Sequence, residues 1–574
     1  MLATDEELKE LIVERLGLVD EAEFEKIRVV ATRLRIPVDR ALAERGVIPM
    51  SFLLKELAQD WSVSFIDLQV GDVNPDALRV LPEEYARGRL VIPIEKKDRE
   101  LRLAMQNPRD KKAIAEIEQM TGLKVVPFLA PEMSIRRAHL LYRGNILELL
   151  ERSAAEAAGP ATRAAGGERS AADLLSRILE YSVVARASDI HIEPYEVETL
   201  VRCRIDGVLK EVLSVAPTAH ASLVARVKIL ASMRIDERRV PQDGRLELDL
   251  SGLRMDIRVS SIPTARGEKL VLRLLAKEAA FVDLEELGLA PSDFDTLRAN
   301  LLRPFGMILV TGPTGSGKST SLYGMLTRLG IERQHALNIS TIEDPIEYTM
   351  PRVSQMAVNV AAGLEFADGL RALLRQDPDV IMVGEIRDKE TADIGVRAAL
   401  VGRLFLSTLH TNDSTGAVAR LLDMGVEPFL LASTLVMVLA QRLVRRICMA
   451  CRESFDGDVT RVAAVRARPD FEHTLGVLRS EGVLGVADDL SGGVRLFRGR
   501  GCLQCAGSGF RGRVGIFEVF QIDDDIRRMI MERRDGAIIR EAAVTAGMKT
   551  MFQDGLAKAL LGDTTLEEVF RVAL

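Results

Sequence analysis

The sequence predicts a multidomain α/β protein built around a parallel β-sheet that binds phosphate, and three observations carry this prediction. The chain has 574 residues, which is too long for one hydrophobic core and suggests about three to four domains. Short, almost wholly apolar runs at residues 307–311 and 380–383 are typical of central parallel strands, and they alternate with helical patterns. Directly after the first run, residues 312–319 match the phosphate-binding pattern G-x-x-x-x-G-K-[ST].

Composition and charge narrow the functional classes. Hydrophobic residues make up 47% of the chain and charged residues 28%, which is the balance of a soluble globular protein. The net charge of −7 gives no sign of a basic surface for nucleic acid. Aromatic residues are scarce, with a single tryptophan, so a surface on which bases could stack is not expected either. We therefore expect no direct nucleic-acid binding. The chain opens without a signal sequence, and its longest apolar stretch, residues 429–444, is interrupted by polar residues. We therefore expect a cytoplasmic protein without a transmembrane segment, which meets the membrane only through partners.

The N-terminal region is expected to contain two modules. Helical apolar spacing, together with a turn that occurs twice, Gly-Leu-Val at 17–19 and Gly-Val-Ile at 46–48, predicts a helical module over residues 1–60. Two short strands and a helix predict an α+β module over residues 61–152. The Ala- and Gly-rich residues 153–172 hold almost no large apolar side chain, so we expect a linker there.

Alternating strands and helices continue after this linker. The expected segments are an α+β domain over residues 173–280, a connector at 281–291, a nucleotide-binding core at 292–447, a cysteine-bounded subdomain at 448–505 and a helical C-terminal part at 506–574.

The phosphate loop is expected to bind ATP with Mg²⁺. Its glycines allow backbone N–H groups to face the phosphates, and the N-terminus of the following helix adds its positive dipole end. Lys318 is expected to neutralise the β- and γ-phosphates, while the Ser319 hydroxyl binds Mg²⁺. The predicted nucleotide-binding residues are Gly312, Pro313, Thr314, Gly315, Ser316, Gly317, Lys318, Ser319 and Thr320.

Candidate catalytic groups follow three other predicted strands. Glu385 ends a buried strand, and Gly384 stands where many ATPases have a Mg²⁺-binding Asp, so Glu385 is expected to serve the attacking water, the metal or both. Glu343 lies in an acidic cluster, Thr-Ile-Glu-Asp-Pro-Ile-Glu, that is a candidate for positioning Mg²⁺ and water. His410 follows an apolar strand and is a candidate sensor of the γ-phosphate, although a lone histidine is as often structural.

Two C-x-x-C pairs predict a structural zinc site. Each pair supplies one edge of a tetrahedron, and four thiolates, from Cys448, Cys451, Cys502 and Cys505, complete it. A redox pair is the alternative, but it requires a thioredoxin-like context that this sequence lacks. Cys203 lies in a strand-like run, where we expect it to be a small buried hydrophobic residue.

Beyond these motifs, residues 173–574 resemble one family, the secretion ATPases of type II secretion and type IV pilus assembly known as the GspE/PilB group. The resemblance includes the family's Asp box, the Walker B segment Val-Gly-Glu-Ile-Arg-Asp and the His box Ser-Thr-Leu-His-Thr-Asn. The segments that carry it lie at residues 187–194, 204–209, 241–245, 341–347, 374–379, 383–388, 407–412 and 440–445.

This resemblance implies a homo-hexameric ring that couples ATP hydrolysis to pilin or pseudopilin assembly on the cytoplasmic side of the inner membrane. It implies that residues 173–280 form a PAS-like domain and that a RecA-like core follows, with ATP bound between the two. The N-terminal region is then expected to bind the inner-membrane platform and cytoplasmic adaptor proteins. A retraction motor or a DNA-uptake ATPase of the same superfamily is the alternative, but retraction motors usually lack the cysteine pairs and the long N-terminal region.

The resemblance also implies functional arginines. Arg258 and Arg273 of the small domain match positions that reach the phosphates, because a guanidinium completes charge neutralisation when the domains close. Alternatively, each of these two arginines forms only a surface salt bridge. The core arginines that match family positions at the nucleotide or the subunit interface are Arg371, Arg375, Arg387 and Arg420.

Two positions depart from the family pattern. Arg403 stands where the His box usually has a second histidine, so a fixed cation replaces histidine chemistry there. Some family members bind cyclic di-GMP through repeated Arg-Leu-Gly motifs. Here the first copy, Arg15-Leu-Gly17, is present, but the second position reads Pro37-Val-Asp39, so we do not expect binding of the dinucleotide.

Overall fold

The computed structural model describes residues 3–143, 146–158, 167–250, 253–276, 284–333, 335–457, 459–485, 490, 494–505 and 507–573. The contacts divide the chain into two compact units. The first unit contains Ala3–Met50 and Ala280–Leu574, and the second contains Ser51–Ala279. The division therefore falls at the start of a helix, α4, and not at residue 60, where the sequence predicted the end of the helical module.

The N-terminal segment is helical, as predicted. Thr4 and Glu7 form a capping box at the start of the first helix, and the Asp20 side chain caps α2, which supplies partners for backbone N–H groups at both helix starts. Both predicted turns adopt left-handed backbone geometry, with φ of 59° at Gly17 and 71° at Gly46. The elements are α1 (Asp5–Lys9), η1 (Glu10–Arg15), α2 (Glu21–Leu34), α3 (Val38–Glu44) and α4 (Met50–Asp60).

The second N-terminal module is an α+β unit with a four-stranded sheet in the order β1-β4-β3-β2. The two strands and the helix predicted from the sequence are confirmed as β2, β3 and α7. The strands are β1 (Ser64–Phe65), β2 (Val91–Lys97), β3 (Glu100–Met105) and β4 (Lys124–Leu129), and the helices are α5 (Pro75–Leu78), α6 (Glu83–Arg89), α7 (Lys111–Thr121) and α8 (Glu132–Ala138).

The linker predicted at residues 153–172 is wrong at both of its ends. Residues 153–158 continue α9 (Ile146–Ala158), and residues 167–172 begin α10 (Gly167–Val184). Alanine is the best helix former, and Ala154 and Ala157 are buried in the same core as Leu174. Small side chains therefore pack in a helix here, although they could not form a core alone. Residues 159–166 lie outside the described residues.

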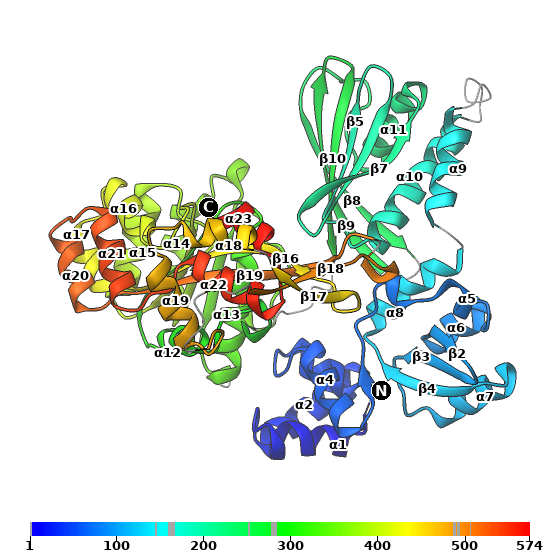
Figure 1. Ribbon diagram of the computed structural model, residues 1–574, viewed down its shortest axis with the longest axis horizontal. Coiled ribbons are helices and arrows are strands. Elements are labelled where there is room, and N and C mark those ends of the chain that lie inside the picture. The colour runs from blue at the N-terminus through cyan, green and yellow to red at the C-terminus, as the bar shows by residue number, and fades with distance from the viewer. Residues whose placement is uncertain are drawn as a thin grey trace. The chain divides into compact units, whose positions relative to one another are not determined.

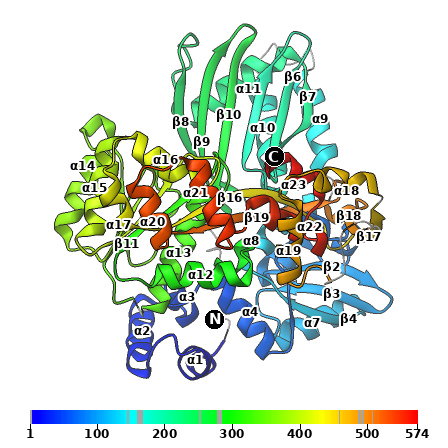
Figure 2. The same ribbon diagram turned by 60° about the vertical axis from the view of Figure 1, so that its left-hand side comes forward.

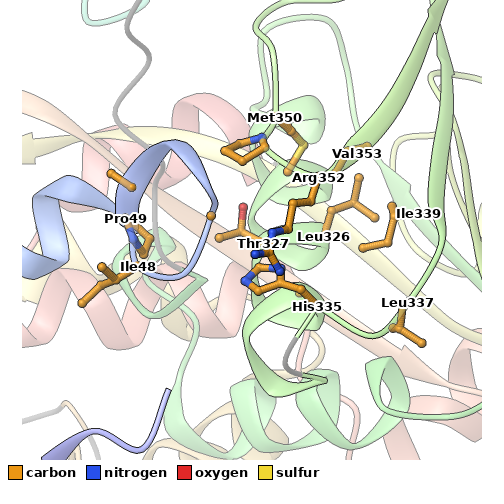
Figure 3. Close-up of a pocket in the computed structure, with 14 residues that line it drawn as sticks. Ile48, Pro49, Leu326, Thr327, His335, Leu337, Ile339, Met350, Arg352 and Val353 are labelled. Carbon is orange, nitrogen blue, oxygen red and sulfur yellow. The ribbon is translucent and has the colours of Figure 1, made fainter. Parts of the chain in front are cut away.

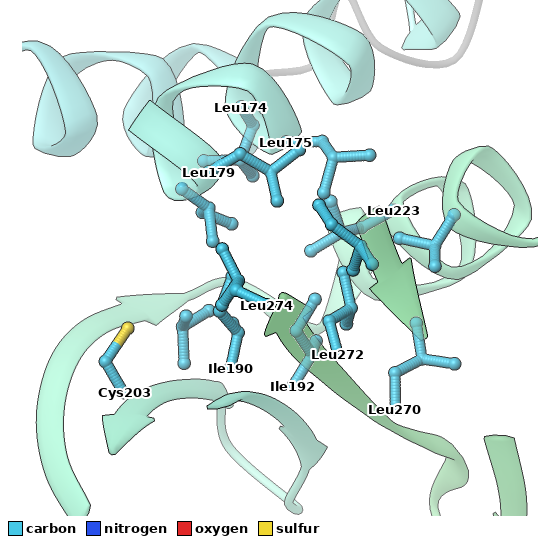
Figure 4. Close-up of a cluster of buried hydrophobic side chains, with 14 of the residues drawn as sticks. Leu174, Leu175, Leu179, Ile190, Ile192, Cys203, Leu223, Leu270, Leu272 and Leu274 are labelled. Atoms are coloured by element: carbon cyan, nitrogen blue, oxygen red, sulfur yellow. The ribbon is translucent and has the colours of Figure 1, made fainter. Parts of the chain in front are cut away.

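The small domain is a six-stranded antiparallel sheet in the order β7-β6-β5-β10-β9-β8. Helices α10 and α11 cover one face of it (Figure 1), and their leucines meet the sheet in one core that includes the fully buried Cys203 (Figure 4). The elements are β5 (Asp189–Pro194), β6 (Thr199–Ile205), β7 (Val208–Val215), α11 (Pro217–Leu230), β8 (Gln242–Leu250), β9 (Leu253–Thr264) and β10 (Gly267–Ala276).

The nucleotide-binding core contains a seven-stranded sheet in the order β13-β12-β14-β15-β11-β16-β19. All neighbours are parallel except β16 and β19. The strands are β11 (Gly306–Thr311), β12 (Ile339–Glu343), β13 (Val353–Ala357), β14 (Val380–Val383), β15 (Leu404–Leu409), β16 (Leu435–Ile447) and β19 (Phe510–Gln521). The expectation that residues 506–574 are helical is therefore wrong for β19, which is buried against β16.

Helices cover both faces of this sheet (Figure 2). Because side chains alternate along a strand, Met307 and Leu309 of β11 pack on one face, and Ile308 and Val310 on the other. The first face is covered by α14 (Phe366–Leu373), α15 (Lys389–Leu400), α16 (Gly416–Asp423), α17 (Pro428–Thr434), α20 (Asp524–Met531) and α21 (Gly536–Thr545), and the second by α12 (Pro291–Leu301) and α13 (Lys318–Glu332).

The cysteine-bounded insertion contains a two-stranded sheet, β17 (Arg452–Gly457) with β18 (Val494–Gly499), and two helices, α18 (Val459–Arg466) and α19 (Phe471–Ser480). It shares one core with the last two helices, α22 (Met551–Leu561) and α23 (Leu566–Ala573). Among the described segments, no helix has the length and apolar character needed to cross a membrane.

Candidate nucleotide site and metal centre

Four predicted motifs meet at one edge of the seven-stranded sheet. Strands β12, β14, β15 and β11 are neighbours and run parallel. Glu343 is the last residue of β12, Glu385 follows β14, His410 follows β15 and the phosphate loop follows β11. The carboxyl ends of such strands are where open α/β sheets bind their ligands.

The phosphate loop has backbone geometry that requires glycine. Gly312, Gly315 and Gly317 have φ of 147°, 79° and 90°. A Cβ atom at Gly312 would overlap the carbonyl oxygen of Gln441, and one at Gly317 would lie 2.9 Å from the Gln441 Nε2 atom. Helix α13 begins at Lys318, within the loop, so its free N–H groups point at the space that the loop surrounds.

Two polar side chains of the loop, Ser316 and Lys318, are candidates to contact a phosphate. Ser316 is 4% exposed, and its Oγ atom has no hydrogen-bond partner among the described residues. The Lys318 ammonium donates hydrogen bonds to the carbonyl oxygens of Gly312 at 2.8 Å and Pro313 at 3.1 Å. Burial lowers the pKa of Lys318, and the Glu385 carboxylate opposes that effect. A glycine cradle with an unpartnered hydroxyl and a nearby ammonium fits a nucleotide phosphate.

The remaining loop residues lie on the open side of this cradle. Pro313, Thr314 and Gly315 are exposed, Thr320 is half-buried, and Ser319 is exposed in the first turn of α13. The Ser319 hydroxyl is therefore accessible to a cation bound beside the phosphates.

Glu385 and His410 form a polar cluster with two further residues. One carboxylate oxygen of Glu385 accepts a hydrogen bond from Arg387 Nε at 2.6 Å, and the other lies 3.1 Å from His410 Nε2. Arg387 also lies 3.4 Å from a carboxylate oxygen of Asp344, and its hydrogen bond to Glu385 raises its pKa. The Glu385 side chain is 19% exposed, so a carboxylate held in place by two neighbours remains accessible to water.

Glu343 ends β12 at the same edge of the sheet, but its carboxylate has partners other than Glu385. Its carboxylate is buried and accepts hydrogen bonds from Thr341 Oγ1 at 2.6 Å, from Gln355 Nε2 at 3.0 Å and from the Tyr323 hydroxyl. Burial, together with the bond to Glu343, raises the pKa of Tyr323. Among the described contacts Glu343 thus joins β12, β13 and α13, and it does not enter the Glu385 cluster.

Gln441 is a site residue that motif reasoning did not single out. It lies on β16, is 1% exposed, and its Oε1 atom accepts a hydrogen bond from Ser321 Oγ at 2.6 Å. The side-chain amide of Gln441 also lies against Gly317, and its backbone carbonyl lies against Gly312. Gln441 therefore packs directly against the phosphate loop. The available signal was a glutamine that directly follows the apolar residues 435–440 of the same strand, because a buried amide must find hydrogen-bond partners.

The two small-domain arginines are neighbours within their own unit. Arg258 and Arg273 are directly opposite each other on β9 and β10, and such pairs project from the same face of a sheet. Arg273 donates a hydrogen bond from Nε to Asp189 Oδ1 at 2.9 Å while its side chain stays 57% exposed. Both cations are therefore presented together by adjacent strands.

The other arginines are distributed over the core. Arg371 pairs with Glu390 and lies 3.2 Å from Asp368, and Arg375 donates to the Arg371 carbonyl at 2.9 Å. Arg420, which the resemblance also implied, lies in the last turn of α16. Arg403, which stands where the family usually has a histidine, lies 3.3 Å from Asp377. Of these core arginines, Arg387 is the one that the described contacts bring to Glu385.

The four cysteines meet, as the sequence predicted. Their sulfur atoms all lie within 4.8 Å of one another. The β16–β17 connection supplies Cys448 and Cys451, and the β18–β19 connection supplies Cys502 and Cys505. The Sγ–Sγ distance is 3.8 Å for Cys448–Cys502 and for Cys451–Cys505, and 3.7 Å for Cys502–Cys505.

Backbone N–H groups favour a thiolate at Cys505. Burial raises the pKa of Cys505, but the N–H groups of Cys502 and Gly509, at 3.1 and 3.2 Å from its sulfur, outweigh burial and bring the pKa to about 7. Burial raises the pKa of Cys448. Because thiolates are the metal ligands, four converging sulfurs, one of which accepts two backbone N–H groups, fit a tetrahedral metal ion.

Comparison with known proteins assigns the chain to a family. The sequence model described as "Type II/IV secretion system protein" matches residues 165–571, and the one described as "MshEN domain" matches residues 61–145. The chain is 38% identical over 576 residues to the type IV pilus assembly ATPase PilB of Myxococcus xanthus, covering 98% of each protein. It is 47% identical over 399 residues to the type II secretion system protein HxcR of Pseudomonas aeruginosa, covering 70% of this chain and 76% of that protein. Among solved structures, the Legionella pneumophila ATPase DotB aligns with 69% of this chain and 94% of its own, at 21% identity and a TM-score of 0.49. The chain therefore belongs to the family of type II/IV secretion system proteins.

Proposed function

We propose that this chain is the ATP-hydrolysing motor subunit of a type II secretion or type IV pilus assembly machine. The observation that carries the proposal is the meeting of the phosphate loop, Glu385 and His410 at one edge of the sheet. The match to a pilus assembly ATPase over 98% of both chains supports the same activity.

The residues of the site have distinct tasks in this proposal. Bound ATP with Mg²⁺ supplies a γ-phosphoryl group whose charge is partly neutralised and which water can attack. Lys318, which now donates to two carbonyl oxygens of its own loop, would donate to phosphate oxygens, and the Ser319 hydroxyl would be a ligand for the cation. The Glu385 carboxylate, oriented by Arg387 and His410, holds the attacking water in line through a hydrogen bond.

We further propose that the four cysteines hold a structural zinc ion. A zinc ion held by these residues would cross-link the β16–β17 connection and the β18–β19 connection. Since β16 also carries Gln441, the same strand connects the metal centre and the support of the phosphate loop.

The assembly proposed from the family is a homo-hexamer on the cytoplasmic side of the inner membrane. Its N-terminal region would bind the platform and adaptor proteins of the machine, with pilin or pseudopilin as the cargo. Arg258 and Arg273, presented together on β9 and β10, would reach the phosphates when the small domain closes on the core.

Two substitutions separate the roles within the site. Lys318→Ala is expected to weaken nucleotide binding and to abolish turnover, because it removes the cation of the loop. Glu385→Ala is expected to leave binding nearly intact and to lower kcat by at least about a hundredfold, the usual contribution of a positioned general base. Glu541→Ala, at an exposed site on α21, is the matched control.

Turnover and the Kd of a fluorescent ATP analogue, measured on the same preparations, read out both effects. Normal turnover by a Glu385→Ala protein that still binds nucleotide would remove Glu385 from its proposed role.

A further inference from the structure

The two repeated turns of the N-terminal segment differ in what they contact. The second turn packs against the ATPase core within the first compact unit, where Ile48 and Pro49 face Thr327, His335 and Arg352 across a small pocket (Figure 3). This surface lies at the end of α13 that is remote from the phosphate loop.

The contact around Gly46 is close. A Cβ atom on Gly46 would lie 3.1 Å from Pro351 Cβ and 3.4 Å from His335 Cε1. Ile48 is 1% exposed, and an ion pair between Glu23 and Arg352, at 3.6 Å, joins α2 to the same part of the core. The turn is therefore seated on the core, with its apolar residues buried.

The first turn provides a natural contrast. Gly17 has the same left-handed geometry as Gly46, with φ of 59° compared with 71°. A Cβ atom on Gly17 would meet no atom of the described residues within 4 Å, apart from its two chain neighbours. Both turns thus require a left-handed backbone at their glycine. The nucleotide-binding core limits the size of the side chain at Gly46 but not at Gly17.

Helix α13 connects this surface to the nucleotide site. It has 15 residues and begins at Lys318, so it is about 22 Å long. Leu326, Thr327 and Gly330 of its second half line the pocket, and the His335 N–H donates to the Gly330 carbonyl at 2.7 Å. Burial and the Arg352 guanidinium lower the pKa of His335, so its ring packs against the turn as a neutral group.

We propose that the Gly46 turn is a latch that couples the N-terminal module to the nucleotide site through α13. Because the ligand is a nucleotide, the inference rests on the proposed function. Phosphate binding orders the first turn of α13, and the docked module orders its last turns, so each event favours the other. Thermodynamic linkage makes this coupling reciprocal: the factor by which bound nucleotide strengthens docking equals the factor by which docking strengthens nucleotide binding. A partner that pulls the module away from the core therefore weakens nucleotide binding by that factor.

The test compares Gly46→Leu with Gly17→Leu in the full-length protein. Both substitutions force a left-handed backbone on leucine, but only the one at position 46 meets the core. Hydrogen exchange over residues 21–49 is expected to rise in Gly46→Leu above its level in Gly17→Leu. The Kd of a fluorescent ATP analogue is expected to rise about fivefold in Gly46→Leu, the lower end of typical couplings, and to stay unchanged in Gly17→Leu.

A second pair of variants tests docking without changing Gly46, in case Gly46→Leu unfolds the N-terminal module itself. Glu23→Arg and Arg352→Glu should each raise exchange over residues 21–49, and the double variant should restore protection, because it rebuilds the ion pair with reversed charges. Exchange in Gly46→Leu that equals exchange in Gly17→Leu, with no effect of the charge variants, would overturn docking. Raised exchange with an unchanged Kd would overturn the coupling. A wild-type protein that binds no nucleotide would refute the proposed function, while the exchange data would still decide whether the turn is docked.

Discussion

The hydrogen bond between Gln441 and Ser321 beneath the phosphate loop permits a quantitative test of how the loop is supported. The Ser321 hydroxyl donates to Gln441 Oε1 at 2.6 Å, and the two residues are 0% and 1% exposed. Gln441→Leu keeps most of the side-chain volume but leaves this hydroxyl without its acceptor inside the core. An unpaired buried hydroxyl costs about 1–3 kcal/mol. In a domain of this size the loss lowers Tm by roughly 2–10 °C.

A double-mutant cycle isolates the hydrogen bond. Ser321→Ala removes the donor, and the double variant Gln441→Leu/Ser321→Ala leaves neither member of the pair unpartnered. The double variant should therefore be more stable than the sum of the single effects predicts, with a coupling of roughly 1 kcal/mol. Calorimetry of the full-length protein measures this, with the core transition identified by its upward shift when ATP is added. Strict additivity of the two single effects would refute the reasoning.

Three further predictions concern other parts of the molecule. Arg258→Ala and Arg273→Ala should lower turnover more than ATP affinity and should weaken nucleotide-dependent hexamer formation; two variants with normal kinetics and normal assembly would show that both arginines form ordinary salt bridges. Metal analysis under reducing conditions should find one zinc per chain, and serine in place of any one of the four cysteines should release the metal and lower the Tm of the C-terminal region, whereas metal-free wild-type protein would exclude the site. Burial pushes the pKa of Glu568 upward, but Arg571 and Arg445 outweigh it and hold the pKa at about 2. A depressed carboxyl pKa stabilises the fold above the unfolded value and loses that effect as pH falls, so roughly 2–3 kcal/mol should disappear between about pH 4.5 and 2. Glu568→Gln should flatten this part of an acid-unfolding profile, and an unchanged profile would contradict the assignment.

The edge of the sheet that carries the site was predictable from sequence. Short apolar strands that end in Glu385, in His410 and in the phosphate loop must place those groups together once the strands are parallel neighbours. The cysteine cluster was predictable for a similar reason, because two C-x-x-C pairs can close only one tetrahedron.

Other features depend on tertiary packing that local patterns do not contain. The carboxylate of Glu343 turns inward because Tyr323, Thr341 and Gln355 supply three donors from three different elements. The Ala-rich residues 153–158 are helical because a neighbouring helix and a sheet provide the core that they lack. The docking of the Gly46 turn could not be read from its sequence, since Gly17 carries the same turn signal without such a contact.

Release of inorganic phosphate from ATP by the purified full-length protein, with and without Mg²⁺, decides whether the assembled site is a motor ATPase. The predicted result is Mg²⁺-dependent release by the wild-type protein and release near background by Glu385→Ala, with ATP bound in both cases. A wild-type protein that binds ATP through Lys318 but releases phosphate no faster than Glu385→Ala would contradict the proposal. Such a protein would use the same loop only to bind nucleotide.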